Sequence, residues 1–266
     1  INDKYKNFFL SKNKTQNMYN PFSLQDKTIL VTGASSGIGK AIAIECSKMG
    51  AKVFITGRNE QRLQETFNQL NGEQPNYIVA DLTIKEDIDN LVEKVKDLDG
   101  LVNCAGISGH SLFSFLKEEE VKNMFDINFF SQMNICKQLL TKKKINKGAS
   151  IVFLTSTSGI LSSYIGGSIY SATKGALNGL IKGMAIELAP KKIRVNSVMP
   201  SMIETPIMNS GDVTEEQFEA DKQKYPLKRY GKPEEVAYAA IYLLSDASTW
   251  TTGTSLLLDG GRSINY

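Results

Sequence analysis

Thr32-Gly33-Ala34-Ser35-Ser36-Gly37-Ile38-Gly39 follows an apolar run at 28–31 and precedes a helical pattern from Lys40 to Met49. Glycines at this spacing suit a strand that turns sharply into a helix, because they permit the turn, let a ligand approach the backbone and let the helix pack closely. The unpaired N–H groups and the positive dipole end of such a helix favour an anion. The stretch therefore predicts a site for a dinucleotide pyrophosphate, with the alternative that the turn is purely structural.

Short apolar runs alternate with longer helical patterns along the rest of the chain. Strands are predicted at 28–32, 52–56, 76–80, 100–104, 150–155, 193–198 and 255–258, and helices at 37–49, 60–70, 85–98, 118–143, 170–190 and 234–245. Continuous apolar strands such as the run at 150–154 suit a parallel sheet that is buried on both faces. The pattern predicts an α/β fold with a doubly wound, mostly parallel seven-stranded sheet and helices on both faces, in a single domain at 21–266.

Two segments depart from this alternation. Residues 1–20 show no amphipathic period, so we expect an N-terminal extension that is flexible or not native, with Met18 as a candidate natural start. The proline-rich segment at 200–232 carries one predicted short helix, from Thr214 to Lys224. A long excursion after the end of a strand is typical of a substrate lid, although it could also be a surface decoration. Its apolar side chains favour an apolar substrate: Met202, Ile203, Ile207 and Met208.

Composition narrows the classes of function. The chain has 266 residues, is 41% hydrophobic and 22% charged, and carries a net charge of +3, which is too mild to indicate a nucleic-acid partner. No apolar run approaches the roughly 20 residues that cross a membrane. Three cysteines and one histidine, His110, argue against a disulfide framework, a metal site and a Ser-His-Asp mechanism. We therefore expect a cytoplasmic protein with no metal, no membrane association and no nucleic-acid partner.

Residues at the ends of the second and third predicted strands indicate which dinucleotide binds. Arg58 stands where sheets that bind NAD carry an acidic residue for the adenosine ribose. A guanidinium suits a 2′-phosphate, so NADP(H) is favoured over NAD(H), with an unliganded exposed arginine as the alternative. Asp81, at the end of the third strand, could accept a hydrogen bond from adenine or could cap the helix that starts near Lys85.

Small residues end the fourth predicted strand, in Asn103-Cys104-Ala105-Gly106. Their size lets the backbone lie against a cofactor, while Asn103 is predicted to tie neighbouring strands together. Cys104 has no charged partner nearby in the sequence, which favours a small buried hydrophobe over a nucleophile.

The most specific group is Ser156 with Tyr170 and Lys174. Tyr170 and Lys174 are four residues apart on a predicted helix, so they share one face. An ammonium beside a phenol is expected to lower the pKa of the phenol, which could then exchange a proton with an alcohol or a carbonyl. Ser156 ends the fifth strand and could hold the substrate oxygen. A pair at this spacing is common on surface helices, but the nearby serine and glycine turn favour a catalytic group.

These motifs resemble those of the short-chain dehydrogenase/reductase family over about 27–261. The resemblance rests on the segment 32–39, Asp81, the segment 103–106, Asn128, Ser156, Tyr170, Lys174 and the ending Thr252-Gly253 to Asp259-Gly260-Gly261. It implies a Rossmann-like fold and a homotetramer. It also implies that Tyr170 is the general acid/base, that Lys174 binds the nicotinamide ribose and that Ser156 positions the carbonyl. Asn128 would hold a water in a proton relay, with a helix irregularity as its alternative role.

The same resemblance implies the cofactor-binding residues and the reaction. The cofactor-binding set is Gly33, Ser35, Ser36, Gly37, Ile38, Gly39, Arg58, Asp81, Leu82, Asn103, Ala105, Gly106, Tyr170, Lys174, Pro200, Ile203 and Thr205. Ser201 replaces the glycine that usually follows the proline. We expect an NADP(H)-dependent oxidoreductase of a small carbonyl or alcohol, most similar to 3-oxoacyl-[acyl-carrier-protein] reductases, with Lys147 and Lys191 where those enzymes meet the acidic carrier protein. The alternatives are a sugar, polyol or other small-alcohol dehydrogenase, and a non-catalytic NADP(H)-binding regulator.

Overall fold

The computed structural model describes residues 19–205 and 214–264. The predictions for residues 1–18, and for Ile207 and Met208 in the expected lid, lie outside these residues. All seven predicted strands are present and parallel, in the order β3-β2-β1-β4-β5-β6-β7. Their bounds are β1 Thr28–Thr32, β2 Lys52–Gly57, β3 Ile78–Val79, β4 Leu98–Asn103, β5 Ile145–Leu154, β6 Arg194–Pro200 and β7 Ser255–Leu258.

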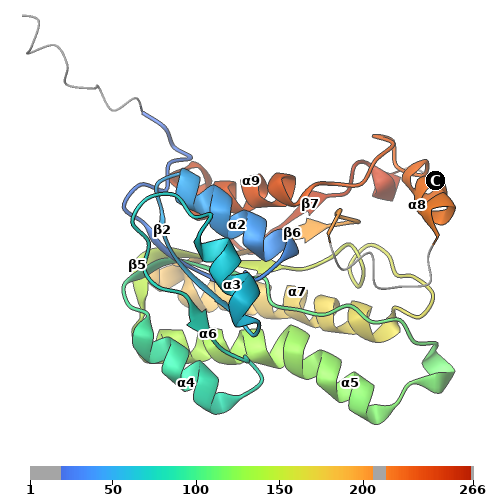
Figure 1. The fold of residues 1–266 in the computed structure, drawn as a ribbon, viewed down its shortest axis with the longest axis horizontal. Coiled ribbons are helices and arrows are strands. Elements are labelled where there is room, and N and C mark those ends of the chain that lie inside the picture. Colours follow the sequence, from blue (N-terminus) through green and yellow to red (C-terminus); the bar gives the residue numbers. More distant parts are fainter. Residues whose placement is uncertain (1–18, 206–213, 265–266) are drawn as a thin grey trace, which may run out of the picture.

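Helices cover both faces of the sheet (Figure 1). One face carries α2 (Gly37–Lys48), α3 (Glu60–Phe67) and α9 (Pro233–Leu244), and the other carries α4 (Lys85–Lys94), α5 (Glu118–Phe125), α6 (Ser131–Thr141) and α7 (Ser168–Leu188). Each face has its own apolar core because side chains alternate along a strand. Ile29 and Val31 of β1 enter the first core, whereas Leu30 between them enters the second. The predicted doubly wound α/β fold is confirmed.

The predicted helix at 118–143 is wrong in one respect. It is divided by a π-helical turn, η2 (Asp126–Phe130), between α5 and α6. A π turn inserts a residue without ending a helix, so the apolar pattern continues through it. The helix predicted at 85–98 ends earlier, at Lys94, because Val95 is extended and Asp97 has a φ of 53°. This early end lets β4 start at Leu98.

The lid segment contains the short helix that its sequence predicts, α8 (Glu215–Lys222). The helix begins with a capping box: Thr214 Oγ1 accepts from the Gln217 N–H, and Gln217 Oε1 accepts from the Thr214 N–H at 2.9 Å. Behind it, the ring of Tyr230 is buried and packs edge to face on the ring of Tyr225. This aromatic packing is internal to the segment, which is joined to the rest of the domain by the Leu227 N–H bond to the Gly260 carbonyl and by the Arg229–Glu235 ion pair.

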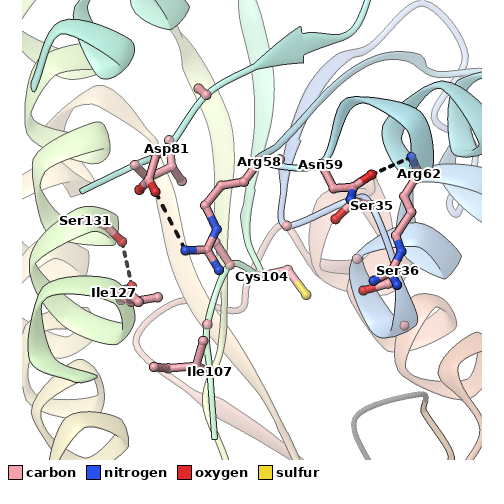
Figure 2. Close-up of a pocket in the computed structure, with 18 of the residues that line it drawn as sticks. Ser35, Ser36, Arg58, Asn59, Arg62, Asp81, Cys104, Ile107, Ile127 and Ser131 are labelled. Atoms are coloured by element: carbon pink, nitrogen blue, oxygen red, sulfur yellow. Dashed lines mark hydrogen bonds and ion pairs between the residues drawn. The ribbon is translucent and has the colours of Figure 1, made fainter. Parts of the chain in front are cut away.

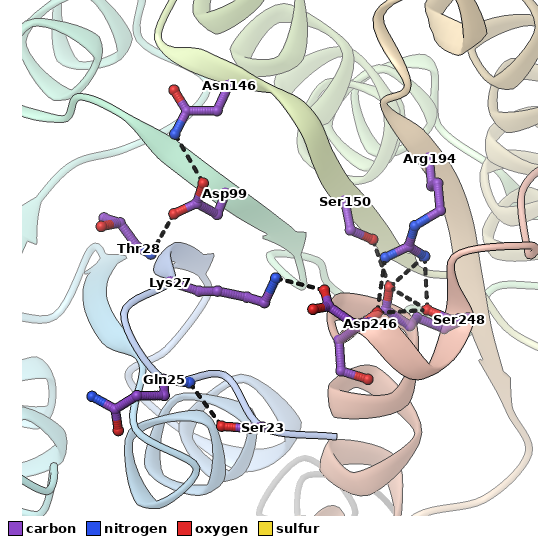
Figure 3. A network of polar contacts seen from close by, with 12 residues as sticks. Ser23, Gln25, Lys27, Thr28, Asp99, Asn146, Ser150, Arg194, Asp246 and Ser248 are labelled. Carbon is purple, nitrogen blue, oxygen red and sulfur yellow. Dashed lines mark hydrogen bonds and ion pairs between the residues drawn. The ribbon is translucent and has the colours of Figure 1, made fainter. Parts of the chain in front are cut away.

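Polar side chains bind one another at the edge of the sheet where the strands begin (Figure 3). Asp99 accepts from the Thr28 N–H and from the Asn146 amide, each at 2.9 Å. The Arg194 guanidinium donates to the Leu243 and Ser245 carbonyls and to the Ser248 hydroxyl. We call the edge where the strands begin the amino edge of the sheet. Two exposed lysines also belong to this edge: Lys147 lies near the start of β5, and Lys191 lies just before β6.

Candidate active site

A cavity of about 350 Å³ lies at the opposite edge, where β1, β2, β3 and β4 end (Figure 2). After β1 the chain continues to β2 on one side, and after β4 it continues to β5 on the opposite side. Doubly wound sheets bind ligands in the crevice between two such neighbouring strands, here β1 and β4. Most of the predicted cofactor-binding residues line it: Gly33, Ser35, Ser36, Gly37, Ile38, Gly39, Arg58, Asp81, Leu82, Ala105, Gly106 and Thr205. Asn103, Tyr170, Lys174, Pro200 and Ile203 do not line this cavity.

The glycine turn is packed so closely that side chains at two of its glycines would collide with the backbone. Gly33 has a φ of +65°, and a Cβ there would lie 2.8 Å from the backbone of Ala105. A Cβ on Gly39 would collide with the carbonyl of Gly33. Gly37 also has a positive φ, and the N-cap of α2, Ser36, makes no side-chain capping bond. The Ser36 side chain therefore does not occupy the N–H groups at the start of α2, which are free to bind an anion in the cavity.

Arg58 lies at the mouth of this cavity with its guanidinium turned toward Asp81 (Figure 2). Its Nη1 is 3.6 Å from Asp81 Oδ2, and 61% of the Arg58 side chain is exposed. Exposed ion pairs of this kind contribute about 0–1 kcal/mol, so this contact holds Arg58 only weakly. The sequence analysis did not assign Arg62, which also lines the cavity and points toward Ser36. Arg62 lies in the first turn of α3, and a second guanidinium this close to the end of β2 was the signal that could have identified it.

Asp81 is part of the turn before α4. Its Oδ1 accepts from the Thr83 N–H at 2.9 Å and the Thr83 hydroxyl at 2.7 Å. Burial acts to raise the pKa of this carboxyl, but the Thr83 hydrogen bonds and Arg58 lower it below its ordinary value. The carboxylate is thus ionised at the cavity wall. It does not cap α4, whose N-cap is Ile84 without a side-chain cap, and its adenine contact stays a prediction.

The predicted role of Asn103 in tying strands together is wrong. Its amide donates to the sulfur of Cys136 on α6, and its Oδ1 is buried without a partner. Thr32 makes the cross-strand contacts instead: its hydroxyl donates to the Val102 carbonyl and accepts from the Cys104 and Ala105 N–H groups. A threonine at the end of β1 can both donate and accept, which suits it to this position.

Cys104 is a poor nucleophile, as the sequence predicts, but it is half-buried at the wall of the cavity and not fully buried. Burial raises the pKa of its thiol to about 12, although the charge of Lys174 acts in the opposite direction. The thiol is therefore protonated and a poor nucleophile at neutral pH.

Ser156, Tyr170 and Lys174 come together beside the end of β5. Ser156 follows β5, and the other two lie in the first turns of α7, on the face that packs toward β5. Lys174 Nζ donates to the Leu154 carbonyl at 2.8 Å and lies 5.7 Å from the centre of the Tyr170 ring. The Ser156 hydroxyl accepts from the Ser158 N–H at 3.1 Å and lies close enough to Tyr170 to lower the pKa of the phenol. The predicted proximity of the three side chains is thus present.

Burial controls the proton affinities in this group. It raises the pKa of Tyr170 to about 12, with the Ser156 hydroxyl acting in the opposite direction. It also lowers the pKa of Lys174 to about 8. The expected lowering of the Tyr170 pKa by Lys174 is therefore wrong for this structure, because desolvation of the phenol dominates and the ammonium binds the Leu154 carbonyl. At neutral pH the phenol carries its proton.

Asn128 lies fully buried in the π-helical turn η2. Its Oδ1 accepts from the Ile107 N–H at 2.8 Å, and its Nδ2 donates to the Ile107 carbonyl at 2.9 Å and to the Thr173 hydroxyl at 3.2 Å. Asn128 therefore fastens the loop after β4 to α7, next to the catalytic group. Its role in a proton relay stays a prediction.

The end of β6 supplies only part of the predicted set. Thr205 reaches the cavity, where its methyl group faces Gly37. Ile203 is buried and pairs with Gly231. Ser201, in place of glycine, binds the Tyr225 hydroxyl at 2.9 Å, so the serine has a hydrogen-bond partner within the segment 200–232. The predicted cofactor contacts of Pro200 and Ile203 stay predictions.

The described residues hold neither a candidate metal cluster nor a helix that could span a membrane. No group of three or more His, Cys, Asp or Glu side chains in 19–205 and 214–264 could hold a metal ion. In the same residues no helix is both long enough and apolar enough to span a membrane.

The fold and this site define a nicotinamide-dependent oxidoreductase: a doubly wound parallel sheet, a glycine-rich turn after β1 and a Ser-Tyr-Lys group after β5. A family model described as "Enoyl-(Acyl carrier protein) reductase" matches residues 33–263. The chain belongs to the short-chain dehydrogenase/reductase family, as its sequence motifs predict.

Named relatives agree with this assignment. The 3-oxoacyl-[acyl-carrier-protein] reductase FabG of Rickettsia prowazekii (strain Madrid E) is 38% identical over 240 residues, which cover 90% of this chain and 97% of that protein. The protein of the same name from Thermotoga maritima is 36% identical over 247 residues, 91% of this chain and 99% of that one. A solved short-chain dehydrogenase/reductase structure from Brucella melitensis, "SDR:Glucose/ribitol dehydrogenase", has a TM-score of 0.85 at 31% identity and covers 91% of this chain and 99% of that one.

Proposed function

We propose that the protein is a cytoplasmic, homotetrameric reductase that uses NADPH to reduce a 3-oxoacyl thioester, including one carried by an acyl carrier protein. The observation that carries the choice of cofactor is Arg58, which stands at the cavity mouth after β2 with its side chain 61% exposed. A guanidinium there favours a 2′-phosphate and replaces the acidic side chain that would bind the ribose hydroxyls of NAD. The choice of substrate is supported by the similarity to enzymes named 3-oxoacyl-[acyl-carrier-protein] reductase.

The residues of the catalytic group have separate roles in this proposal. When bound, the nicotinamide cofactor supplies the hydride that reaches the carbonyl carbon. Tyr170 gives its proton to the carbonyl oxygen, for which its protonated state at neutral pH is suited. Ser156 donates a hydrogen bond to the same oxygen and fixes its position. Lys174 places a buried positive charge near the phenol and stabilises the negative charge that remains on Tyr170.

A sugar or polyol dehydrogenase is the second candidate. It is supported by the structural likeness to the Brucella melitensis protein named glucose/ribitol dehydrogenase. The same Ser-Tyr-Lys group could serve alcohol oxidation. A non-catalytic NADP(H)-binding regulator is disfavoured, because a protein without catalysis has no need for a buried Lys174 beside Tyr170.

Lys147 and Lys191 are the residues expected to contact the acyl carrier protein. Both are exposed at the amino edge, and Lys147 is nine residues before Ser156 along an extended strand, a span of roughly 30 Å. Carrier docking at these lysines stays a proposal. A carrier bound there would not lie beside Tyr170 of the same chain.

The decisive experiment is an assay of 3-oxoacyl thioesters and of polyols with NADPH, NADH and their oxidised forms. We expect wild-type protein to reduce the thioesters with NADPH in preference to NADH. Arg58→Asp should raise the KM for NADPH by about 10–100-fold, because a charge-assisted hydrogen bond is lost, and should leave the KM for NADH nearly unchanged or lower.

Arg229→Gln is the matched control, since Arg229 pairs with Glu235 and does not line the cavity. An unchanged cofactor preference in Arg58→Asp would contradict the assignment of NADP(H). Turnover of polyols but of no thioester would favour the second candidate.

A further inference from the structure

A second cavity of about 300 Å³ lies on the other side of the loop that follows β4. Tyr170 forms part of its wall, and Ile107 lines both this cavity and the cofactor cavity. A substrate whose carbonyl oxygen meets the Tyr170 hydroxyl could therefore extend a substituent into the second cavity while the cofactor occupies the first.

The lining of this cavity is apolar inside and polar at its mouth. Five half-buried apolar side chains contribute to it: Ile107, Leu116, Val121, Met124 and Ile169. The polar side chains Glu120 and Asn123 are exposed. Among the described residues that line it there is no Lys or Arg. A phosphate or carboxylate would meet the Glu120 carboxylate, and His110 is the one basic side chain among the lining residues that the structure describes, so the cavity suits an uncharged, largely apolar group better than an anion.

Its walls combine a fixed side with an adaptable one. The loops after β4 and β5 are joined by a bond from the Ser111 N–H to the Gly166 carbonyl at 3.0 Å, and by one from the Tyr164 hydroxyl to the Gly109 carbonyl at 3.1 Å. On the α5 side, the methyl end of Met124 lies directly over Gly109, where a Cβ would collide with it. An unbranched thioether side chain can change rotamer and make room for chains of different length.

We propose that this second cavity holds the unbranched aliphatic chain of the substrate, so that Val121 and Met124 determine the preferred chain length. The proposal rests on the proposed function, since it describes the acyl part of the same thioester. Burial of each methylene contributes up to about a fourfold gain in binding, so chain length has a measurable effect on kcat/KM.

The test compares 3-oxoacyl thioesters of N-acetylcysteamine with four and with ten carbons in the acyl group. Wild-type protein should prefer the ten-carbon substrate. Val121→Phe should reduce the ratio of kcat/KM for ten carbons to that for four carbons by at least tenfold, because the phenyl ring fills the cavity. Met124→Ala should move the optimum to longer chains, because it widens the cavity.

Ile186→Phe is the matched control: Ile186 is 77% exposed on α7 and lines neither cavity, so the ratio should not change. NADPH binding measured on each variant reports whether the protein has folded. A ratio unaltered in both Val121→Phe and Met124→Ala, with thioester reduction intact, would overturn the proposal for the cavity alone. Failure of wild-type protein to reduce either thioester would overturn the proposed function and this proposal with it.

Discussion

At the amino edge of the sheet, Asp99 and Arg194 direct their hydrogen bonds to groups of the protein itself, whereas at the opposite edge Arg58 and Arg62 face a cavity (Figures 2 and 3). Both edges carry polar residues on the same seven strands. Asp99 is paired through both oxygens, and Arg194 binds two carbonyls and a hydroxyl. Arg58 has a single long contact with Asp81. Paired polar groups stabilise a fold, and weakly held ones at a cavity remain available to a ligand.

The comparison predicts that variants at the two edges fail in different ways. A change at the cavity edge should reduce turnover with little effect on stability. A change at the amino edge should reduce stability with little effect on turnover.

The largest expected effect is that of Tyr170→Phe. Removal of the hydroxyl should lower kcat about 10³-fold, since no other group gives a proton to the carbonyl oxygen, and should change the NADPH dissociation constant less than threefold. Steady-state kinetics and a binding titration measure both. Tyr164→Phe serves as the control, because its hydroxyl binds only the Gly109 carbonyl, and it should change kcat by a few fold. Near-normal turnover in Tyr170→Phe would remove this residue from the mechanism.

The pH dependence should differ between the two directions of the reaction. Because burial raises the pKa of Tyr170 to about 12, the phenol keeps the proton that carbonyl reduction needs, and this step should be nearly independent of pH from 6 to 7. It should slow above about pH 8, because Lys174, whose pKa burial lowers to about 8, then loses the charge that stabilises the Tyr170 anion. Alcohol oxidation needs the deprotonated phenol, whose fraction rises tenfold per pH unit below the pKa of Tyr170. Its kcat/KM should therefore increase by about tenfold per unit from pH 6 to 7. A plateau near pH 7 would mean that the pKa of Tyr170 is lowered when ligands bind.

The smallest expected effect is at the amino edge. Arg194→Met should lower the free energy of unfolding by about 1–2 kcal/mol, because the Leu243 and Ser245 carbonyls lose a half-buried charged donor, while kcat/KM changes less than twofold. Chemical denaturation and kinetics measure the two quantities. Lys27→Met breaks the surface ion pair with Asp246 and should cost less than about 0.5 kcal/mol. If Arg194→Met instead reduced turnover at unchanged stability, the contrast between the edges would fail.

Local sequence patterns were sufficient for the strands, the glycine turn and the proximity of Tyr170 to Lys174. Each depends on neighbours within a few residues, such as the i, i+4 spacing on α7 or the apolar run before Gly33. The errors arose where contacts come from distant parts of the chain. Asn103 binds Cys136 on another helix, and the pKa of Tyr170 is controlled by burial that no local spacing reveals. The π turn at Asn128 agrees with the helix irregularity that was the alternative for this residue, but the helical pattern on either side of it did not give its position or its type.

The hydrogen bonds from Asn128 to Ile107 have a thermodynamic consequence. Ile107 lies between the cofactor cavity and the second cavity. The buried side-chain amide of Asn128 holds it in place, because it hydrogen-bonds to both the N–H and the carbonyl of Ile107. A ligand that binds in one cavity and moves Ile107 therefore changes the volume of the other cavity. By thermodynamic linkage, if bound nucleotide changes the affinity of the protein for an acyl chain by some factor, then a bound acyl chain changes the affinity of the protein for the nucleotide by the same factor.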